Sequence, residues 1–551
     1  MSGSRSVAIS GGGAPEDDET GGETRDPTGV PNLDEIMGGG LPRGSLTLVM
    51  GLPGSGKTTL ASQIAFTAAR TGRTALILTA LSEPTSKLIA HLRAFAFFDP
   101  EFVGGSVQFL SLRSALAMGL EATANAIIAE ARRIHAGLVM LDGFRGMSGV
   151  SSDPQAAREF LYSIGATLST LGTTTIVTSE TDPYDEKYFP ETTTSDIILG
   201  LHYNLLGVRQ SRGIEVIKTR MAAPLPGLHA LTLGTDGAVV YPQFEERVAT
   251  NLLGGDAQTQ GDVQHAANAG LAAYVNGVIE RASFDLKELD TMLEGGIPRA
   301  TCALLAGSLG TGKTLLALYF ALAGARAGER VVFLSFREGR AQLVQAAGNF
   351  EIGADVEREL RPGGHISLIE TLPIKLNADI LADRLLSVLD QTGAQRLVID
   401  SVAELERAIK RSSDPQRLED YLAALLLAVR SRNITGLFIK ESERAVAATL
   451  DFSADALSVL AESVLLLQQV AFNGNLHRIL SIPKLRFSGH DTSLREFRIS
   501  APQGLEVLQP ISSEVGVLEG ITRRQEGQSV VTSPSREQRR RRRVSENVHD
   551  A

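Results

Sequence analysis

Residues 51–58 read Gly51-Leu-Pro-Gly-Ser-Gly-Lys57-Thr58, and they follow an apolar run at 46–50. A second stretch of the same pattern, Gly307-Ser-Leu-Gly-Thr-Gly-Lys313-Thr314, follows an apolar run at 303–306. Both match G-x-x-x-x-G-K-[ST], in which a glycine-rich loop joins a strand to a helix. The chain therefore carries the same strand, loop and helix twice.

Such a loop binds phosphate for a specific physical reason. Glycines let successive backbone N–H groups converge on phosphate oxygens, and the following helix adds the positive end of its dipole. The lysine reaches the β- and γ-phosphates, and the threonine hydroxyl binds Mg²⁺. A glycine-rich turn with a chance lysine is the alternative for one loop, but two loops in register disfavour it. The sequence predicts ATP and Mg²⁺ as ligands, with these residues at the nucleotide: Gly51, Gly54, Ser55, Gly56, Lys57, Thr58, Thr59, Gly307, Gly310, Thr311, Gly312, Lys313, Thr314 and Leu315.

Composition limits the classes of protein to consider. The chain has 551 residues, 43% of them hydrophobic, which is enough for two large cores. Its net charge of −10 argues against a dedicated DNA-coating protein, because duplex affinity comes largely from basic side chains. The single cysteine, Cys302, lies in an apolar run, so we expect a buried hydrophobe and a reducing cytoplasm. No apolar stretch reaches the roughly 20 residues that cross a bilayer, so no membrane contact is expected.

The repeat also divides the chain into regions. The N-terminal residues are glycine-rich, polar and acidic, which is typical of disorder. The C-terminal tail contains an arginine run at 539–543, which is usually a solvated mobile segment but also fits nucleic acid, an acidic partner or a membrane surface. The expected regions are a disordered tail at 1–26, a first domain at 27–245, a linker at 246–280, a second domain at 281–520 and a basic tail at 521–551.

Short apolar runs alternate with helix-like segments in both halves. Apolar strands separated by helices are typical of a parallel sheet covered on both faces. We therefore predict an α/β fold of two domains, each with a mainly parallel sheet and an antiparallel section near its end, at 215–220 and 479–486. Further strands are expected at 75–79, 138–141, 175–178, 331–334, 397–399 and 436–439.

An aspartate closes one apolar run in each half: Asp142 ends 137–142 and Asp400 ends 396–400. A carboxylate at the end of a buried parallel strand is suited to orient Mg²⁺ beside the phosphate loop. Either aspartate alone could instead cap a helix. Their matching places favour a role at the metal, together with Thr58 and Thr314.

The sequence around the two loops resembles one known family. Each half carries Leu-Asp-x-x-x-x-Gly-Gly-[Leu/Ile]-Pro-Arg before its phosphate loop, ending at Arg43 and Arg299. Together with the late segments Leu465-Leu-Leu-Gln468 and Arg495-Glu-Phe-Arg-Ile499, this resembles the KaiC family over about residues 27–510. The resemblance implies tandem RecA-like P-loop domains and a double-ring hexamer with ATP at subunit boundaries. It also implies ATP hydrolysis mainly in the first domain and serine/threonine autokinase activity in the second.

The resemblance implies catalytic glutamates, but this sequence departs from the family pattern. Two adjacent glutamates are expected after the second strand of each domain, whereas this chain has Ser82-Glu83 and Arg337-Glu338. Glu83 and Glu338 could still prepare the attacking water or hydroxyl, because a carboxylate accepts a proton and arginine cannot. The alternative is that both are solvated acids at helix starts. Slow or lost catalysis in either domain is therefore an open alternative.

The resemblance implies three further sets of residues. Lys218 and Arg220, and Lys484 and Arg486, match a basic pair that reaches a neighbouring subunit's γ-phosphate. Solubilising surface cations are the alternative. Alignment on Gln468 places Ser458 and Val459 where the family has its phosphoacceptors, so Ser458 is the expected acceptor, with Ser453 as a nearby hydroxyl and an ordinary surface serine as the alternative.

Three functions fit these features of the sequence. The favoured hypothesis is an oligomeric ATPase with autokinase activity, which acts as a nucleotide-driven regulatory switch, forms homohexamers and has regulatory protein partners. The second is a ring scaffold that uses ATP for assembly and hydrolyses little. The third is a RecA-like recombination ATPase that binds DNA, which the acidic composition disfavours and the arginine run leaves open.

Overall fold

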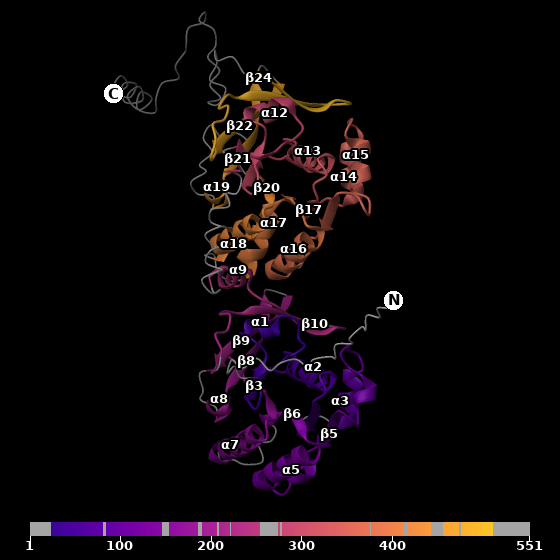
Figure 1. Cartoon of the computed structure of the whole chain (residues 1–551), viewed down its shortest axis with the longest axis vertical. Coiled ribbons are helices and arrows are strands. Elements are labelled where there is room, and N and C mark those ends of the chain that lie inside the picture. The colour runs from indigo at the N-terminus through magenta and orange to yellow at the C-terminus, as the bar shows by residue number, and fades with distance from the viewer. Residues whose placement is uncertain are drawn as a thin grey trace, which may run out of the picture.

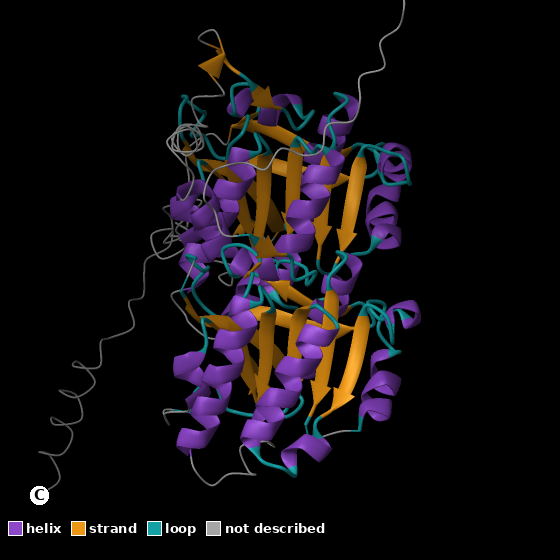
Figure 2. Cartoon of the chain, turned by 60° about the horizontal axis from the view of Figure 1, so that its bottom comes forward, coloured by secondary structure: helices purple, strands orange, loops and turns teal. Residues whose placement is uncertain are grey.

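The computed structural model describes residues 24–80, 84–145, 154–185, 190–206, 209–220, 222–253, 274–275, 278–374, 376–412, 417–441, 456–472 and 475–510. These residues form two α/β domains, each built on a nine-stranded sheet, which are stacked along the long axis of the molecule (Figure 1). Helices cover both faces of each sheet (Figure 2). The predicted fold class is confirmed.

The first sheet has the strand order β11-β10-β9-β8-β3-β7-β6-β4-β5. From β5 to β8 all neighbouring strands are parallel, and from β8 to β11 they are antiparallel. The antiparallel section predicted near the end of the domain is therefore present. Its strands are β3 (Leu46–Gly51), β4 (Thr74–Thr79), β5 (Val107–Ser111), β6 (Ala136–Asp142), β7 (Thr174–Ser179), β8 (Ile197–Leu206), β9 (Arg209–Thr219), β10 (His229–Gly234) and β11 (Gly237–Tyr241).

The second sheet repeats this arrangement in the order β18-β17-β19-β20-β16-β21-β22-β23-β24. Its parallel part runs from β18 to β21, and its antiparallel part runs from β21 to β24. The strands are β16 (Cys302–Gly307), β17 (Val331–Ser335), β18 (Ile366–Glu370), β19 (Arg396–Asp400), β20 (Thr435–Glu441), β21 (Ser463–Phe472), β22 (Asn475–Leu485), β23 (Arg495–Ser500) and β24 (Gly504–Pro510).

The central strands are apolar throughout because helices bury both of their faces. In β3, Val49 packs into the core on one face, whereas Leu48 and Met50 pack into the core on the other. Cys302 lies in the matching strand β16, where burial raises the pKa of its thiol to about 12, so the predicted buried cysteine is confirmed. The principal helices are α2 (Lys57–Arg70), α3 (Thr85–Leu92), α5 (Leu120–Arg133), α7 (Pro154–Thr170), α13 (Lys313–Arg326), α14 (Arg340–Gly348), α15 (Gly353–Glu359), α16 (Ala378–Thr392), α17 (Val402–Ser412) and α18 (Arg417–Ser431).

Shorter elements complete the two domains. β1 begins at Arg25, so it overlaps the N-terminal tail expected at 1–26. Among the described residues, no helix is long and apolar enough to cross a membrane. The shorter elements are β1 (Arg25–Asp26), α1 (Leu33–Ile36), β2 (Leu41–Pro42), the 3-10 helix η1 (Pro100–Phe102), α4 (Arg113–Leu116), α8 (Pro190–Thr194), β12 (Tyr274–Val275), β13 (Val278–Ile279), β14 (Arg281–Ala282), α12 (Lys287–Met292), β15 (Ile297–Pro298) and α19 (Ala456–Leu460).

A helix joins the two domains. α9 (Phe244–Leu253) follows the first sheet but packs on α16 and α18 of the second domain, where Phe244 contacts the Tyr421 ring at 4.9 Å between centroids. Arg417 bridges Glu245 of α9 and Asp379 of α16. The boundary expected between residues 245 and 246 therefore falls inside α9.

Candidate functional site

Both phosphate loops connect a central strand to the start of a helix. The first loop leaves β3 at Gly51 and enters α2 at Lys57. Gly54 and Gly56 have φ of 82° and 109°, a region that favours glycine. A Cβ on Gly56 would lie 2.7 Å from Leu233 Cδ1, so the loop also has no room for a side chain there. The second loop repeats this path between β16 and α13.

The two loop lysines are buried and bind their own loops. Lys57 Nζ donates to Gly51 O at 2.7 Å and to Leu52 O at 3.1 Å. Lys313 Nζ donates to Gly307 O at 2.9 Å and to Ser308 O at 2.7 Å. Burial lowers the pKa of both ammonium groups, and nearby carboxylates oppose this effect. Each lysine therefore places a positive charge on the inner side of its glycine-rich loop.

Each loop threonine contacts the aspartate that ends a parallel strand of the same sheet, β6 in the first domain and β19 in the second. Thr58 Oγ1 donates to Asp142 Oδ1 at 3.0 Å, and Thr178 Oγ1 donates to the same oxygen at 2.7 Å. In the second domain, Thr314 Oγ1 donates to Asp400 Oδ2 at 2.7 Å. Burial raises the pKa of Asp400, and the bond from Thr314 and the charge of Lys313 oppose the rise.

These hydroxyl and carboxylate pairs fit a magnesium nucleotide. Among the described residues, no group of three or more His, Cys, Asp or Glu side chains could hold a metal ion by itself. Mg²⁺ in nucleotide sites is commonly held by one or two protein groups together with phosphate oxygens. The pairs Thr58 with Asp142 and Thr314 with Asp400 have the hydroxyl and carboxylate oxygens that such a site requires.

A cavity of about 460 Å³ opens beside the first loop. Its volume lies within the range of about 300–1,000 Å³ that small-ligand sites occupy. Glu180, which follows β7, lines the cavity together with Lys57 and Asp142, and His91 and Phe95 line it from the region of α3. Neither Glu180 nor the matching Glu441 at the end of β20 was predicted from the sequence, although a glutamate repeated at this place in both halves is a signal that could have found them. His91 and Phe95 had no comparable signal.

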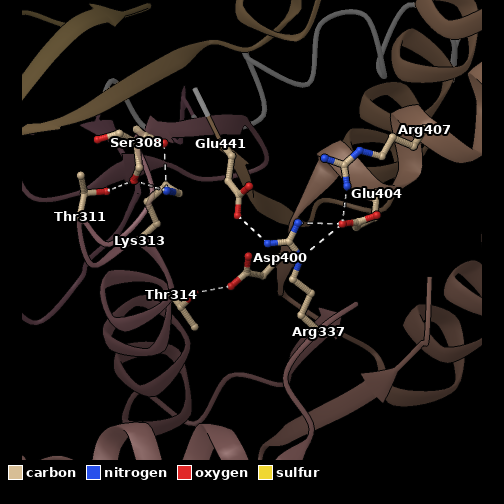
Figure 3. Close-up of polar contacts among 10 residues, drawn as sticks. Ser308, Thr311, Lys313, Thr314, Arg337, Asp400, Glu404, Arg407 and Glu441 are labelled. Atoms are coloured by element: carbon tan, nitrogen blue, oxygen red, sulfur yellow. Dashed lines mark hydrogen bonds and ion pairs between the residues drawn. The ribbon is translucent and has the colours of Figure 1, made fainter. Parts of the chain in front are cut away.

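A cluster of charged side chains lies near the second loop (Figure 3). Arg337 Nη1 donates to Glu441 Oε1 at 2.9 Å, and its Nη2 donates to Glu404 Oε1 at 2.9 Å. Arg407 Nη1 donates to the same Glu404 oxygen at 2.8 Å. The sequence showed Arg337 only as the replacement of a glutamate, and these partners could not be predicted from it.

Glu338 follows Arg337 and is half-buried. Its backbone N–H donates to Ser335 Oγ at 3.1 Å, whereas its Oε2 is buried and has no hydrogen-bond partner in the described part of the chain. Burial is the main cause that raises the pKa of this carboxyl, and the charge of Asp400 adds to the rise. Glu338 is therefore a carboxyl group near Asp400 whose pKa is raised above the ordinary value of glutamate. Ser82 and Glu83, the matching residues of the first domain, lie outside the described residues.

The sequence of both domains matches one known protein family. The family model "ATPase: KaiC" matches residues 26–245 and again residues 284–512. The chain belongs to the KaiC family of ATPases. The circadian clock oscillator protein KaiC of Picosynechococcus sp. is 28% identical over 482 residues, covering 86% of this chain and 87% of that protein. The KaiC proteins of Rippkaea orientalis and Thermostichus vulcanus are 27% and 26% identical and cover 86% and 90% of this chain and 87% and 92% of their own lengths.

The basic pair of the first domain of this KaiC-family ATPase lies far from its own loop. Arg220 pairs with Asp196 at 3.4 Å, and Asp196 accepts a bond from the N–H of Leu46, the first residue of β3. The phosphate loop begins at the opposite end of β3, roughly 17 Å away for a six-residue strand. Lys218 Nζ donates to Ser195 O at 2.7 Å, just after α8.

The basic pair of the second domain has the same setting. The backbone N–H of Arg486 donates to Glu462 O at 3.0 Å, and the Glu462 side chain accepts a bond from Cys302, the first residue of β16. Lys484 Nζ donates to the carbonyls of Ser458 and Val459, both at 3.0 Å. Neither basic pair therefore lies at the phosphate loop of its own domain.

Ser458 lies in α19, next to this second pair. Its side chain is 4% exposed, whereas Val459 is 53% exposed. In this KaiC-family chain the hydroxyl expected to accept phosphate is thus buried, and α19 is tied to β22 through Lys484. Ser453 lies outside the described residues.

Proposed function

We propose that this KaiC-family ATPase binds Mg·ATP at both phosphate loops and works as a homo-oligomer, with six subunits as the expected number. The observation that carries the proposal is the repeated set of loop, lysine, threonine and aspartate at the same edge of two equivalent sheets. The domains that we propose span residues 27–245 and 281–520, and the expected location is the cytoplasm.

Each loop residue has a role in this proposal. The backbone N–H groups of the glycines and the start of α2 or α13 would bind phosphate oxygens. Lys57 and Lys313 would turn from their loop carbonyls towards the β- and γ-phosphates, and the pairs of Thr58 with Asp142 and Thr314 with Asp400 would hold Mg²⁺. When bound, Mg²⁺ neutralises phosphate charge and ATP supplies the transferable γ-phosphoryl group. His91 and Phe95 give the first cavity an aromatic end that suits a purine base.

The arrangement of the basic pairs supports assembly. Because Arg220 lies at the edge of the sheet opposite the loop of its own domain, it is better placed to act on a neighbouring subunit than within its own. Arg486 has the equivalent place in the second domain. We therefore assign Lys218 and Arg220, and Lys484 and Arg486, to the γ-phosphate of a neighbouring protomer, where the guanidinium would add charge that is absent from an isolated chain.

Glu83 and Glu338 are the general bases of this proposal. A carboxylate activates water or a hydroxyl when its pKa lies close enough to the working pH, and burial moves Glu338 in that direction. Ser458 is the proposed acceptor of an autokinase reaction in the second domain. Because its hydroxyl is buried, phosphate transfer requires α19 to move away from the core. Nucleotide-driven regulation of partner proteins would use such a movement as its switch.

One experiment separates the enzyme from its alternatives. Purified chain is incubated with Mg·ATP, and its mass in solution, released phosphate and covalent phosphate are measured together. ATP-dependent assembly with phosphate release above a no-enzyme control supports the ATPase, and a phosphopeptide that contains Ser458 and disappears in Ser458→Ala supports the autokinase. Ser453→Ala is the matched control. A monomer that takes up no adenine nucleotide would overturn the proposal.

A second candidate has one specific observation in its favour. The second site holds Arg337 rather than a further carboxylate, and arginine cannot take a proton from water. A ring scaffold that binds ATP and hydrolyses little fits this feature. Normal ATP-dependent assembly without phosphate release would favour the scaffold.

A further inference from the structure

The Arg337 guanidinium lies at the phosphate-binding end of the second domain. It follows β17, whose last residue, Ser335, is paired with Asp400 of β19. In Figure 3 the guanidinium lies beside the Asp400 carboxylate, between Glu441 and Glu404. The charge of Arg337 also acts on the loop lysine, Lys313, whose pKa it lowers after the larger effect of burial. Arg337 is therefore close enough to the loop to respond to the charge of a nucleotide.

Arg337 can leave Glu441 at low cost. Its side chain is 48% exposed, whereas those of Glu404 and Glu441 are 9% and 30% exposed. Glu404 would keep Arg407 as a partner, and Glu441 would keep the nearby charge of Lys313. The pair of Arg337 with Glu441 is partly exposed, and such pairs stabilise proteins only weakly, so a stronger anion can compete for the guanidinium.

The first domain has a serine in the sequence position of this cation. Lys57 lies near Asp142 and Glu180, as Lys313 lies near Asp400 and Glu441. The residue that precedes the proposed base is Ser82 in the first domain and Arg337 in the second. A guanidinium binds phosphate in a planar, two-bond geometry that neither serine nor lysine can reproduce.

We propose that Arg337 is a nucleotide-sensing residue of the second domain, which exchanges Glu441 for the γ-phosphate when a triphosphate is bound. The inference rests on the proposed ATP site. Because a diphosphate has no γ-phosphate, the exchange occurs with ATP and not with ADP. Arg337 thus raises the preference of the second site for ATP over ADP, and ADP leaves it paired with Glu441 and Glu404.

The test compares Arg337→Gln with Arg407→Gln in the full chain carrying Lys57→Ala, so that binding to the second loop is measured. Arg407 is the matched control because it binds the same Glu404 oxygen as Arg337. It belongs to α17, one helical turn after Glu404, whereas Arg337 follows β17. Calorimetry gives the affinities for ADP and for a non-hydrolysable ATP analogue with Mg²⁺. Thermal unfolding without nucleotide measures any purely structural effect of each substitution.

We expect Arg337→Gln to weaken binding of the ATP analogue about tenfold and binding of ADP less than about twofold. Arg407→Gln should leave the ratio unchanged, and Arg337→Lys should fall between wild type and Arg337→Gln. Equal weakening of both nucleotides, or no change in the ratio, would overturn the inference and leave the ATP site intact. Failure of the second loop to bind either nucleotide before Arg337 is changed would overturn the proposed ATP site, and the inference with it.

Discussion

The two nucleotide sites share their loops but differ in the residues that face them. In the first domain, the charged groups that act on Lys57 are Glu180 and Asp142. In the second, Glu441 and Asp400 act on Lys313 in the same way, and Arg337 adds a positive charge. The two sites therefore share a loop lysine with two carboxylates near it, and they differ in the positive charge that Arg337 adds to the second site.

The two sites differ in the sequence that follows β4 and β17, beyond the last paired residues of these strands. Asp142 and Asp400 are fixed because each ends a buried parallel strand that is paired with β4 or β17. Glu83 follows Thr79 by four positions, whereas Glu338 follows Ser335 by three. A loop after a strand tolerates such a change in length because no ladder hydrogen bonds depend on it. Divergence between the two halves is thus expected in these loops before it is expected in the strands.

The largest expected difference between the sites is in ATP turnover. Glu83→Gln should lower steady-state phosphate release about 100-fold or more, since general bases contribute roughly 10²–10⁴-fold and the family resemblance implies that most hydrolysis occurs in the first domain. Glu338→Gln should change total phosphate release by less than about twofold. The second site has Arg337 in place of a second glutamate, and arginine cannot accept a proton, so this site is expected to contribute little to hydrolysis. Phosphate release is measured on both variants at saturating Mg·ATP. A larger loss with Glu338→Gln than with Glu83→Gln would reverse the assignment of the two sites.

The next expected difference is in nucleotide occupancy. Lys57→Ala and Lys313→Ala should each lower bound nucleotide from two per chain to one, and the double variant should bind none. Loss of the charge-assisted bonds from one lysine is expected to weaken its own site about 100-fold. Equilibrium dialysis with labelled ATP measures the stoichiometry. Arg326→Ala serves as the control because Arg326 lies at the far end of α13 from the loop. If either single variant lost both nucleotides, the sites could not be treated as separate.

Much of the fold could be predicted from local sequence. The apolar runs gave the central strands because strands buried on both faces need apolar side chains at every position. The repeated loop motif also gave the order of strand, loop and helix. The limits of α9 could not be found in this way. Phe244 and Val248 are buried by helices that lie more than a hundred residues further along the chain, so the local sequence did not show to which domain they belong.

The candidate site was predicted only in part for a similar reason. Asp142 could be placed near Thr58 because the carboxyl ends of parallel strands meet at one edge of a sheet. Phe95 gave no such signal, since it reaches the cavity from a turn after α3. The contacts of Arg337 with Glu404 and Glu441 join three separate elements, and no spacing in the sequence connects them.

The smallest expected effect is on the free energy of unfolding of the nucleotide-free protein, through Glu338 in the second site. The pKa of Glu338 is raised in the folded chain, mainly by burial, so the folded state holds this proton more tightly than the unfolded state. At low pH both states are protonated and the group has no effect on the free energy of unfolding. As the pH rises through the ordinary range of glutamate, the unfolded state loses its proton first, and the folded state becomes less stable until its own carboxyl ionises.

Glu338→Gln removes this ionisation, so the variant should match wild type at low pH and become more stable at neutral pH. The gain should be at most about 1 kcal/mol, because the carboxyl is only half-buried and solvent reduces the cost of its charge. Denaturant unfolding of nucleotide-free protein at several pH values measures it, with the exposed Glu419→Gln as the control. Equal stability of Glu338→Gln and wild type at every pH would mean that Glu338 has an ordinary proton affinity. The second site would then lack a base tuned by burial, and the scaffold alternative would gain support.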